Sequence, residues 1–401
     1  MSYHPTDEVT TVIGMPLPFK NGEYKNRIDA LRSQMIKEKI DFLLLFHQES
    51  MYYLFGYDQL GYWVYQTAVI DVNKEDITVL CRPADHNFIE GLPYVKEVRN
   101  WIDDSNKSPV ELTIEMLFDL KALKPKKRIG IELGSHALLP KYYVELEKSL
   151  KDQCSLVDAS RIVTNLRQIK TDSEVVYMKE AGKVLDSAYN AALNVFKPGV
   201  LETEVLGAAM SGMFEAGGHV PAIVPPISSG PRSMSNTHGA AVDRVIKLGE
   251  HITIEPGSSR FRYHAVGVQT WWLGEPPKEV EMAFHGLLTA QKEARSIIKA
   301  GIASADVARK INQTLIEKDL HIPGAHHGYG IGIGYPPTWL DDLRIKETDY
   351  HILEKNMTFF LVSRFPVFNL ADYPIQIYVG EPILVTDEGC ERLSSTQISL
   401  N

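Results

Sequence analysis

Apolar residues in the first part of the chain recur alternately with helical and with strand-like spacing. A helix is predicted at 24–38, because apolar residues there recur three and four positions apart. Short apolar runs bounded by polar segments follow and are typical of strands. This alternation predicts an α/β domain that ends near Asp158. Its strands are predicted at 41–46, 67–72, 77–80 and 128–131, its other helices at 110–120 and 140–150, and an aromatic-rich loop at 51–65.

The second part contains two similar pairs of helices. Thr171 followed by Glu174 is a capping-box pattern, and Pro198-Gly199 ends the helix that starts there. A comparable Lys-Ala-Gly stop follows about one hundred residues later, which suggests an internal duplication. Helices outside an antiparallel sheet would leave one concave face free for a ligand. The predicted helices are 171–196, 202–216, 280–300 and one from 303, and the predicted strands are 246–254, 263–272, 358–365 and 375–384.

Length and composition set the number of domains and the class of ligand. A chain of 401 residues is longer than a single core usually supports. We therefore predict an α/β domain at 1–165 and an α+β domain at 166–401. Apolar residues make up 44% and charged residues 23%, as in ordinary globular proteins. The net charge of −9, without clusters of Lys and Arg, argues against a nucleic-acid surface.

We expect the protein to act in the cytoplasm. Its first residues lack a basic segment followed by an apolar one, and no run reaches about eighteen apolar residues, so neither export nor a membrane span is expected. Cys81, Cys154 and Cys390 lie far apart in the sequence, which suits reduced thiols.

Glu255 and His238 are the first candidates for catalysis. Glu255 follows the alternating run His-Ile-Thr-Ile and precedes Pro256-Gly257, so that a carboxylate is expected at the end of an apolar strand. Burying it there is costly unless something binds it. The ordinary alternatives are a glutamate that points to solvent and a histidine exposed on a turn.

Several segments resemble the creatinase and aminopeptidase P family, whose catalytic domain has the pita-bread fold. Arg167-Gln-Ile-Lys resembles the start of the family's entry helix, and Tyr53-Leu-Phe-Gly resembles a turn of its N-terminal domain. His238 precedes Glu255 by 17 residues, the separation between a catalytic histidine and the first metal-binding aspartate of the family. The resemblance implies a pita-bread domain with internal duplication, preceded by a creatinase-like α/β domain, and a homodimer.

The same comparison predicts that the family's metal centre is missing. Metal-dependent members hold two metal ions with two Asp, one His and two Glu side chains. Of these positions only the one at Glu255 carries a carboxylate here, whereas a divalent ion needs about four to six N, O or S ligands. We therefore expect no metal and no other cofactor. The other ligand positions fall on Val266, Tyr329, Val362 or a neighbour, and Gly380, and a later active-site histidine falls on Pro336.

Within the family, the sequence most resembles the ectoine hydrolases, which share this loss of ligands. The stretch from Gly328 to Pro337 and the run Met357-Thr-Phe carry the resemblance. It implies that the amidinium ring of ectoine, and of hydroxyectoine, is opened to N-acetyl-2,4-diaminobutyrate. The amidinium carbon is electron-poor without a metal ion, so the reaction needs an anion beside the cation and a proton shuttle.

Glu255 and His238 can meet these needs. Glu255 can bind the amidinium through charge-assisted hydrogen bonds of roughly 1.5–3 kcal/mol each. It then either attacks the amidinium carbon or acts as a general base on water. Histidine side chains ordinarily titrate near neutral pH, which suits His238 to a proton shuttle.

Further residues are candidates for contact with the substrate. Tyr329 lies between two glycines, so its backbone can approach a ligand and its phenol can donate to it. Arginine is the best partner for a carboxylate, and Arg260, Arg262 and Arg364 are candidates. His326-His327 is predicted to be structural or to support other residues of the site, since adjacent strand residues point to opposite faces. The predicted catalytic residues are Glu255, His238 and Tyr329, and the predicted substrate-binding residues are Tyr52, Trp63, Thr237, His264, Gln269, Trp271 and Arg364.

Alternatives remain open for several of these residues. Tyr329 also fits a tyrosine packed in a glycine-rich turn, and the aromatic loop with Tyr52 and Trp63 fits packing at a dimer interface as well as closure of the partner's site. Only one of Trp271 and Trp272 is expected to face the pocket, because they alternate along a strand. Two other functions also fit: a hydrolase of guanidino or amidino acids, and a peptidase-like protein that binds without catalysis.

Overall fold

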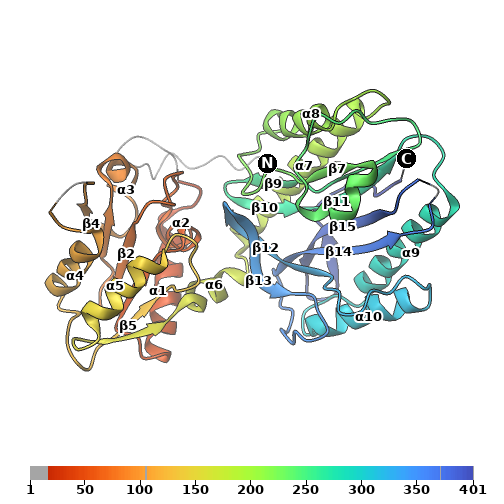
Figure 1. Cartoon of the computed structure of the whole chain (residues 1–401). Helices are drawn as coiled ribbons and strands as arrows, with labels where there is room; N and C mark the ends of the chain where they lie inside the picture. The colour runs from red at the N-terminus through yellow and green to blue at the C-terminus, as the bar shows by residue number, and fades with distance from the viewer. Residues whose placement is uncertain (1–16, 104–105, 371, 401) are drawn as a thin grey trace. The chain divides into compact units, whose positions relative to one another are not determined.

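The chain folds as two compact units, of which the second begins at Gln168 (Figure 1). The computed structural model describes residues 17–103, 106–370 and 372–400, without the side chains of residues 235–237. None of the described helices is both long and apolar enough to cross a membrane.

The first unit is an α/β domain on a mixed six-stranded sheet with the order β4-β3-β2-β1-β5-β6. The strands and helices predicted for this part of the chain are confirmed. β4 and β6 were not predicted. In β4, Lys, Glu and Arg leave the strand only half-buried and hide the apolar pattern. The strands are β1 (Phe42–Leu45), β2 (Thr67–Asp71), β3 (Ile77–Cys81), β4 (Val95–Asn100), β5 (Arg128–Ile131) and β6 (Ser155–Asp158), and the helices are α1 (Asn21–Lys37), α2 (Gln48–Phe55), η1 (Pro83–Asp85), α3 (His86–Ile89), α4 (Pro109–Asp119), α5 (Pro140–Leu150) and α6 (Ser160–Gln168).

The prediction of a loop at 51–65 is wrong at its start, because its first residues belong to helix α2. Glu132 is fully buried and holds the start of this helix. Its carboxylate accepts the backbone N–H groups of Phe46 and His47 at 2.7 Å each and the hydroxyl of Ser50 at 2.6 Å. These contacts fix the two residues before α2 and the hydroxyl of its first turn. Because Glu132 is distant in the chain, the local sequence does not show this contact.

The second unit is an α+β domain on one ten-stranded sheet. The strand order is β7-β8-β11-β15-β14-β12-β10-β9, with β13 paired to β12 and β16 to β15. The elements are α7 (Asp172–Val195), α8 (Glu202–Glu215), β7 (Ile227–Ser229), η2 (Gly230–His238), β8 (His251–Ile254), β9 (Gly257–Arg260), β10 (Tyr263–Val266), β11 (Val268–Trp272), α9 (Lys278–Arg295), α10 (Ser304–Ile316), β12 (Gly328–Tyr335), β13 (Thr338–Arg344), β14 (Thr358–Val367), β15 (Ile375–Val385) and β16 (Cys390–Arg392).

The four predicted helices are present, although the one expected to reach residue 300 ends at Arg295. The capping box at the start of α7 is confirmed, where Thr171 and Glu174 bond reciprocally. Two of the predicted strands are wrong in extent. The strand expected at 246–254 begins only at His251, because a turn precedes it in which the N–H of Glu250 bonds to the carbonyl of Lys247. The strand expected at 263–272 is interrupted at Gly267 and forms β10 and β11.

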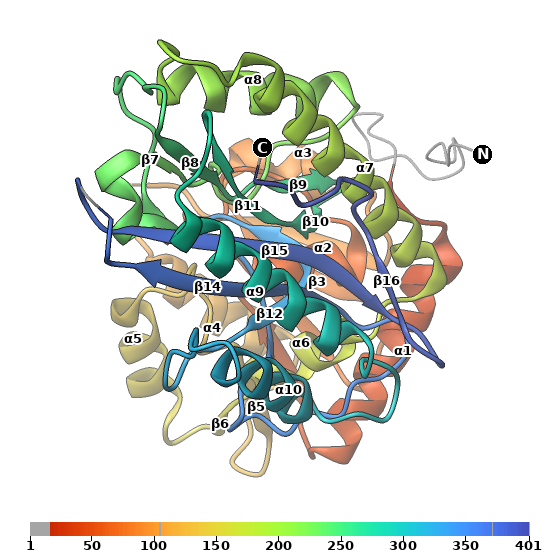
Figure 2. The ribbon, with the colours of Figure 1, turned by 90° about the vertical axis from the view of Figure 1, so that its right-hand side faces the viewer.

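Strand β14 separates a core face from a free face. Phe359 and Leu361 pack into a hydrophobic core with α9 and α10, and Figure 2 shows α9 crossing β14 and β15. The alternate residues Phe360, Val362 and Arg364 line a cavity on the opposite face. This is the period-two alternation of a strand. The helices α7 and α8 cover another part of the sheet with a core of their own.

Candidate active site

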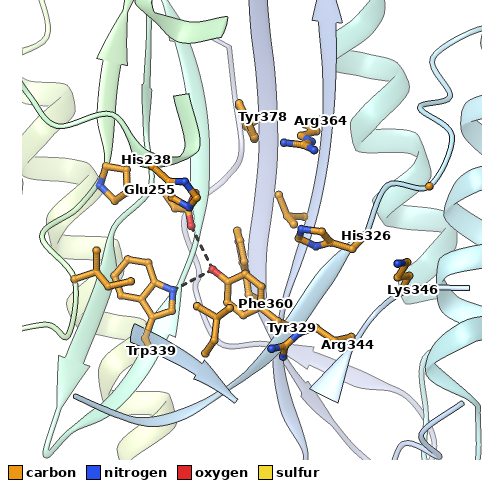
Figure 3. Close-up of a pocket in the computed structure, with 15 residues that line it drawn as sticks. His238, Glu255, His326, Tyr329, Trp339, Arg344, Lys346, Phe360, Arg364 and Tyr378 are labelled. Carbon is orange, nitrogen blue, oxygen red and sulfur yellow. Dashed lines mark hydrogen bonds between the residues drawn. The ribbon is translucent and has the colours of Figure 1, made fainter. Parts of the chain in front are cut away.

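A cavity of about 580 Å³ lies on the free face of the second unit's sheet. Its described lining includes one carboxylate, Glu255, together with His238 and Tyr329 (Figure 3). These three residues come from different elements, and all were predicted as catalytic candidates. The strand pairing therefore brings together side chains that are up to 91 residues apart in the chain.

Glu255 directly follows β8 and is fixed by its backbone. Its N–H bonds to the carbonyl of Pro226 at 2.9 Å, and the preceding Ile254 pairs with Ile227 on one side and Gln269 on the other. The side chain is 9% exposed. Burial raises the pKa of Glu255 to about 8, and a hydrogen bond from Tyr329 acts in the opposite direction. The carboxyl group of the free protein is thus poised to lose its proton when a cation binds beside it.

Tyr329 links Glu255 to Trp339 through a directed pair of hydrogen bonds. The indole Nε1 of Trp339 donates to the Tyr329 hydroxyl at 3.0 Å, and that hydroxyl donates to Oε1 of Glu255 at 3.3 Å (Figure 3). An indole N–H can only donate a hydrogen bond, so the Tyr329 hydroxyl accepts from Trp339 and donates its own hydrogen bond to Glu255. Burial raises the pKa of Tyr329 well above its ordinary value, which keeps this donor protonated. Within the part of the chain that the structure describes, Tyr329 is the single hydrogen-bond donor to the Glu255 side chain.

A glycine beside Glu255 makes room for Trp339. A Cβ atom at Gly257 would lie 2.4 Å from the Trp339 ring, far inside van der Waals contact. The Pro256-Gly257 step therefore serves close packing of the indole that holds Tyr329. From the sequence, this step marked only the end of a strand.

His238 stands at the end of the 3-10 segment η2 and is exposed to the cavity. The start of this segment is anchored by Glu202, a fully buried residue of α8. Glu202 accepts the N–H and the hydroxyl of Ser229 at 2.7 Å each and pairs with Arg232. The anchor ties the segment that carries His238 to the helical layer.

Four cationic or titratable side chains also line the cavity: Arg344, Lys346, Arg364 and His326. Of these, the sequence singled out only Arg364 for the substrate. None of the three permanent cations forms an ion pair with a described carboxylate. Burial lowers the pKa of His326, and Arg364, Arg344 and Lys346 lower it further. His326, predicted to be structural or supporting, thus lies among these cations, while His327 is buried and bonds to Asn312 at 2.7 Å.

Three predicted substrate-binding residues lie outside the described cavity lining. Both ring nitrogens of His264 are engaged, Nδ1 with the carbonyl of Arg262 at 2.8 Å and Nε2 with the N–H of Ala222 at 2.9 Å. Trp271 packs in the core with α7 and donates to Oε1 of Gln269 at 3.0 Å. Both faces of β11 are covered at this point, because Trp272 packs in the core under α9. These residues support the sheet around the cavity.

The other predicted contacts stay predictions. Tyr52 is buried in α2 and Trp63 is 65% exposed, and both belong to the first unit. Thr237 is one of the residues whose side chains lie outside the described part of the structure. Arg260 pairs with Glu180, and Arg262 lies over the ring of Tyr335 at 4.5 Å; neither arginine lines the cavity.

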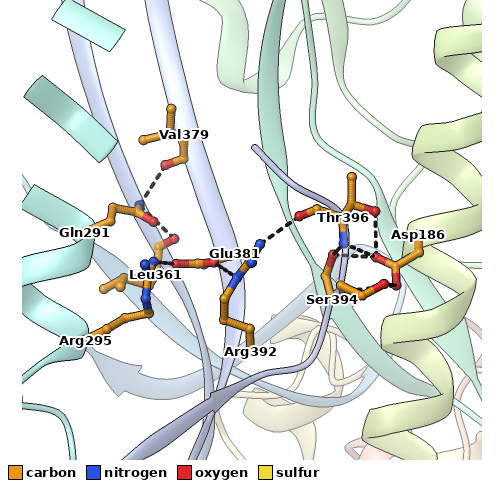
Figure 4. A network of polar contacts seen from close by, with 10 residues as sticks. Asp186, Gln291, Arg295, Leu361, Val379, Glu381, Arg392, Ser394 and Thr396 are labelled. Atoms are coloured by element: carbon orange, nitrogen blue, oxygen red, sulfur yellow. Dashed lines mark hydrogen bonds and ion pairs between the residues drawn. The ribbon is translucent and has the colours of Figure 1, made fainter. Parts of the chain in front are cut away.

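The residues present do not fit a two-metal centre. Val362 and Gly380, which take two of the ligand positions, face each other across β14 and β15. Glu381, the carboxylate next to Gly380, is 2% exposed and pairs with Arg295 and Arg392 (Figure 4). Among the described residues, no group of three or more His, Cys, Asp and Glu side chains could hold a metal ion. The donor set at Glu255 therefore falls short of the four to six ligands that a divalent ion takes.

The fold and the site define a two-domain hydrolase whose catalytic domain has the pita-bread fold. The family described as the creatinase/prolidase N-terminal domain matches residues 27–169, and metallopeptidase family M24 matches residues 176–372. Together they cover most of the chain, which belongs to the creatinase and aminopeptidase P family. The chain is accordingly a hydrolase of C–N bonds.

Sequence alignments with two named hydrolases cover almost the whole chain. The ectoine hydrolase of Halomonas elongata is 27% identical over 400 residues, covering 96% of this chain and 98% of the relative. The Xaa-Pro dipeptidase of Pyrococcus furiosus is 26% identical, covering 94% and 99%. Among solved structures, the Xaa-Pro dipeptidase from Bacillus anthracis superposes with a TM-score of 0.79 at 22% identity, covering 94% of this chain and 99% of that one. The last likeness concerns the fold alone.

Proposed function

We propose that this protein opens the amidinium ring of ectoine, and of hydroxyectoine, by hydrolysis without a metal ion. The observation that carries the proposal is the state of Glu255: a buried carboxyl group with one phenolic donor, in a cavity whose other charged groups are cationic. Ectoine is a zwitterion with an amidinium and a carboxylate. Its two charges are complementary to the two kinds of group in the cavity. The 27% identity to an ectoine hydrolase over nearly the full length supports the same substrate.

Binding of the amidinium would be coupled to release of the Glu255 proton to solvent. The amidinium N–H groups donate to the carboxylate, and the nearby cation lowers the pKa of Glu255 from its value of about 8. Each such charge-assisted hydrogen bond contributes roughly 1.5–3 kcal/mol. Arg344 pairs in register with Tyr329 and lies at the same level of the cavity. It is the arginine best placed for the carboxylate on the ring.

The hydrolysis adds one water molecule across one C–N bond. An oxygen nucleophile adds to the amidinium carbon, the bond to one ring nitrogen breaks, and that nitrogen leaves as an amine after gaining a proton. The other nitrogen stays in the acetamide of N-acetyl-2,4-diaminobutyrate. His238 delivers the proton to the leaving nitrogen. Glu255 acts by one of two routes: it adds to the carbon itself and is freed by water, or it takes a proton from an attacking water.

The proposal is tested by offering three substrates to purified, chelator-treated protein: ectoine, creatine and a proline-containing dipeptide. Ring opening of ectoine, followed by NMR, is the expected result. Cleavage of creatine alone would favour a guanidino hydrolase, and absence of any turnover would favour a binding protein. Dipeptide hydrolysis by the untreated protein that chelation abolishes would overturn the metal-independent mechanism. Intact-mass analysis after a rapid quench separates the two routes, because only direct attack leaves the substrate attached to the protein.

A further inference from the structure

The cationic side chains of the cavity occupy two levels along the strands. Tyr329 on β12 pairs in register with Arg344 on β13 and with Phe360 on β14. Glu255 bonds to Tyr329, so these residues share one level. We call the level of Glu255, Tyr329 and Arg344 the near end.

His326, Lys346 and Arg364 lie beyond that level, all in the same direction. β12 runs antiparallel to both β13 and β14, so residues before Tyr329 lie beside residues after Arg344 and after Phe360. The ladder continues there, because the N–H of His327 bonds to Ile345 and its carbonyl accepts the N–H of Val362.

Lys346 lies two residues past Arg344, and Arg364 lies four residues past Phe360. At about 3.4 Å per residue along β14, the backbone of Arg364 is displaced from the near end by roughly 14 Å, and Lys346 lies in the bend that directly follows β13. We call His326, Lys346 and Arg364 the far end of the cavity (Figure 3).

The far end carries positive charge that the described protein does not neutralise. Neither Lys346 nor Arg364 pairs with a described carboxylate. The nearby acidic residues are engaged elsewhere: Glu347 accepts the amide of Asn312 at 2.6 Å, and Asp349 pairs with His351. The same cations lower the pKa of His326, after the effect of burial. A cleft lined by one sign of charge concentrates ligands of the opposite sign.

The single carboxylate of ectoine does not reach the far end of the cavity. The carboxylate of ectoine is bonded to the ring itself, so it stays close to the amidinium bound at Glu255 and within reach of Arg344. A cavity of about 580 Å³ is of the size that holds drug-sized ligands, in the range of roughly 300–1,000 Å³. It leaves room for a longer acidic substituent.

We propose that His326, Lys346 and Arg364 form a subsite for a second carboxylate, and that the preferred substrates are amidino compounds with two acidic groups. Ectoine, with one carboxylate, then occupies only the near end and is a smaller substrate than the preferred ones. The inference rests on the proposed function, because it takes Glu255 as the site of the amidinium.

Two matched amidines test the subsite in turnover: N-acetimidoylglycine with one carboxylate and N-acetimidoyl-L-glutamate with two. We expect kcat/KM for the dicarboxylate to exceed that for the monocarboxylate by about 10-fold or more, as one charge-assisted hydrogen bond contributes. In Arg364→Gln and Lys346→Gln this ratio should fall to within about 3-fold of unity. Lys346→Arg should keep it, and so should Lys299→Gln, which removes an exposed charge outside the cavity. A ratio near unity in the unmodified protein, or one that neither glutamine variant changes, overturns the subsite.

A binding experiment keeps this test independent of the reaction. If the protein hydrolyses no amidine at all, the proposed function fails, and the subsite is judged by calorimetric titration with the unreactive pair N-acetyl-L-glutamate and N-acetylglycine. Tighter binding of the dicarboxylate by about 10-fold, lost in the Lys346→Gln/Arg364→Gln double variant, supports the far-end subsite. Equal affinities, or no binding of either acid, overturn it.

Discussion

Glu255 and Glu381 are both buried carboxylates on the sheet of the second unit, and they differ in what surrounds them. Glu381 is 2% exposed and is bound by two arginines, Arg295 and Arg392. Glu255 is 9% exposed and has one neutral phenol as its donor. The fold supplies a counter-charge to the first and none to the second. A buried carboxylate with its own cations is already neutralised within the fold, whereas one without them is available for a cation that a ligand brings.

The largest expected effect is that of Glu255→Gln on turnover. The amide has the same size but can neither carry the negative charge nor accept a proton, so ring opening of ectoine should fall by about 10³-fold or more. Product formation followed by NMR measures this. The thermal unfolding midpoint should be no lower than that of the unmodified protein, because the change removes no counter-charge. Turnover within ten-fold of normal would remove Glu255 from the mechanism.

The second largest effect is expected in the pH dependence of the unfolding free energy, to which Glu255 contributes through its raised pKa. The folded-state pKa of Glu255, about 8, lies above its ordinary value of 4.5. The unfolded chain therefore loses this proton first, and the contribution of Glu255 to stability, fully present below about pH 4.5, is lost as the pH rises towards 8. Relative to Glu255→Gln, the unmodified protein should lose on the order of 4 kcal/mol of unfolding free energy between pH 5 and pH 8.5. Urea unfolding of both proteins at the two pH values measures it, and parallel curves would contradict the raised pKa.

Glu381→Ala should affect stability and spare the chemistry. It leaves Arg295 and Arg392 without their partner, and since both arginines are partly exposed, the expected loss of unfolding free energy is about 2–3 kcal/mol. Chemical denaturation measures this loss. Joint replacement of all three residues by methionine should recover part of the stability, because apolar packing can replace a buried ion pair. A large drop in kcat with unchanged stability would show that Glu381 is not merely structural.

Tyr329→Phe should have the smallest effect of the four. The variant removes the donor that lowers the pKa of Glu255, so this pKa should rise further and kcat/KM should fall by about 10-fold. In a pH–rate profile, the limb that reports ionisation of Glu255 should move to higher pH. Trp339→Phe, which removes only the donor to Tyr329, should shift the limb less and in the same direction. An unmoved limb in Tyr329→Phe would separate the phenol from the carboxylate.

The sequence predicted the parts of the site that depend on local pattern. The alternating run before Glu255 and the glycines beside Tyr329 were visible, and the capping box at Thr171 set the start of α7. Arg344, Lys346 and Trp339 were missed because they reach the cavity only through the pairing of β12, β13 and β14.

Other differences between the predicted and the observed site arise from strand pairing and packing contacts that the spacing of residues in the sequence does not show. The glycine-rich segment that forms β12 lacks the alternation of a typical strand, so neither it nor its register was predicted. His264 and Trp271 had suitable chemistry, but a backbone amide and a helical core engage them.

The alternation along β14 bears on how this protein can change over evolutionary time. Phe359 and Leu361 build the core, while Val362 and Arg364 face the ligand cavity. Mutations at the cavity positions can therefore alter the range of substrates at little cost to folding. A lineage that gained or lost an acidic group on its substrate could follow such a path one residue at a time. The same strand would make a suitable target for directed evolution of new amidine specificities.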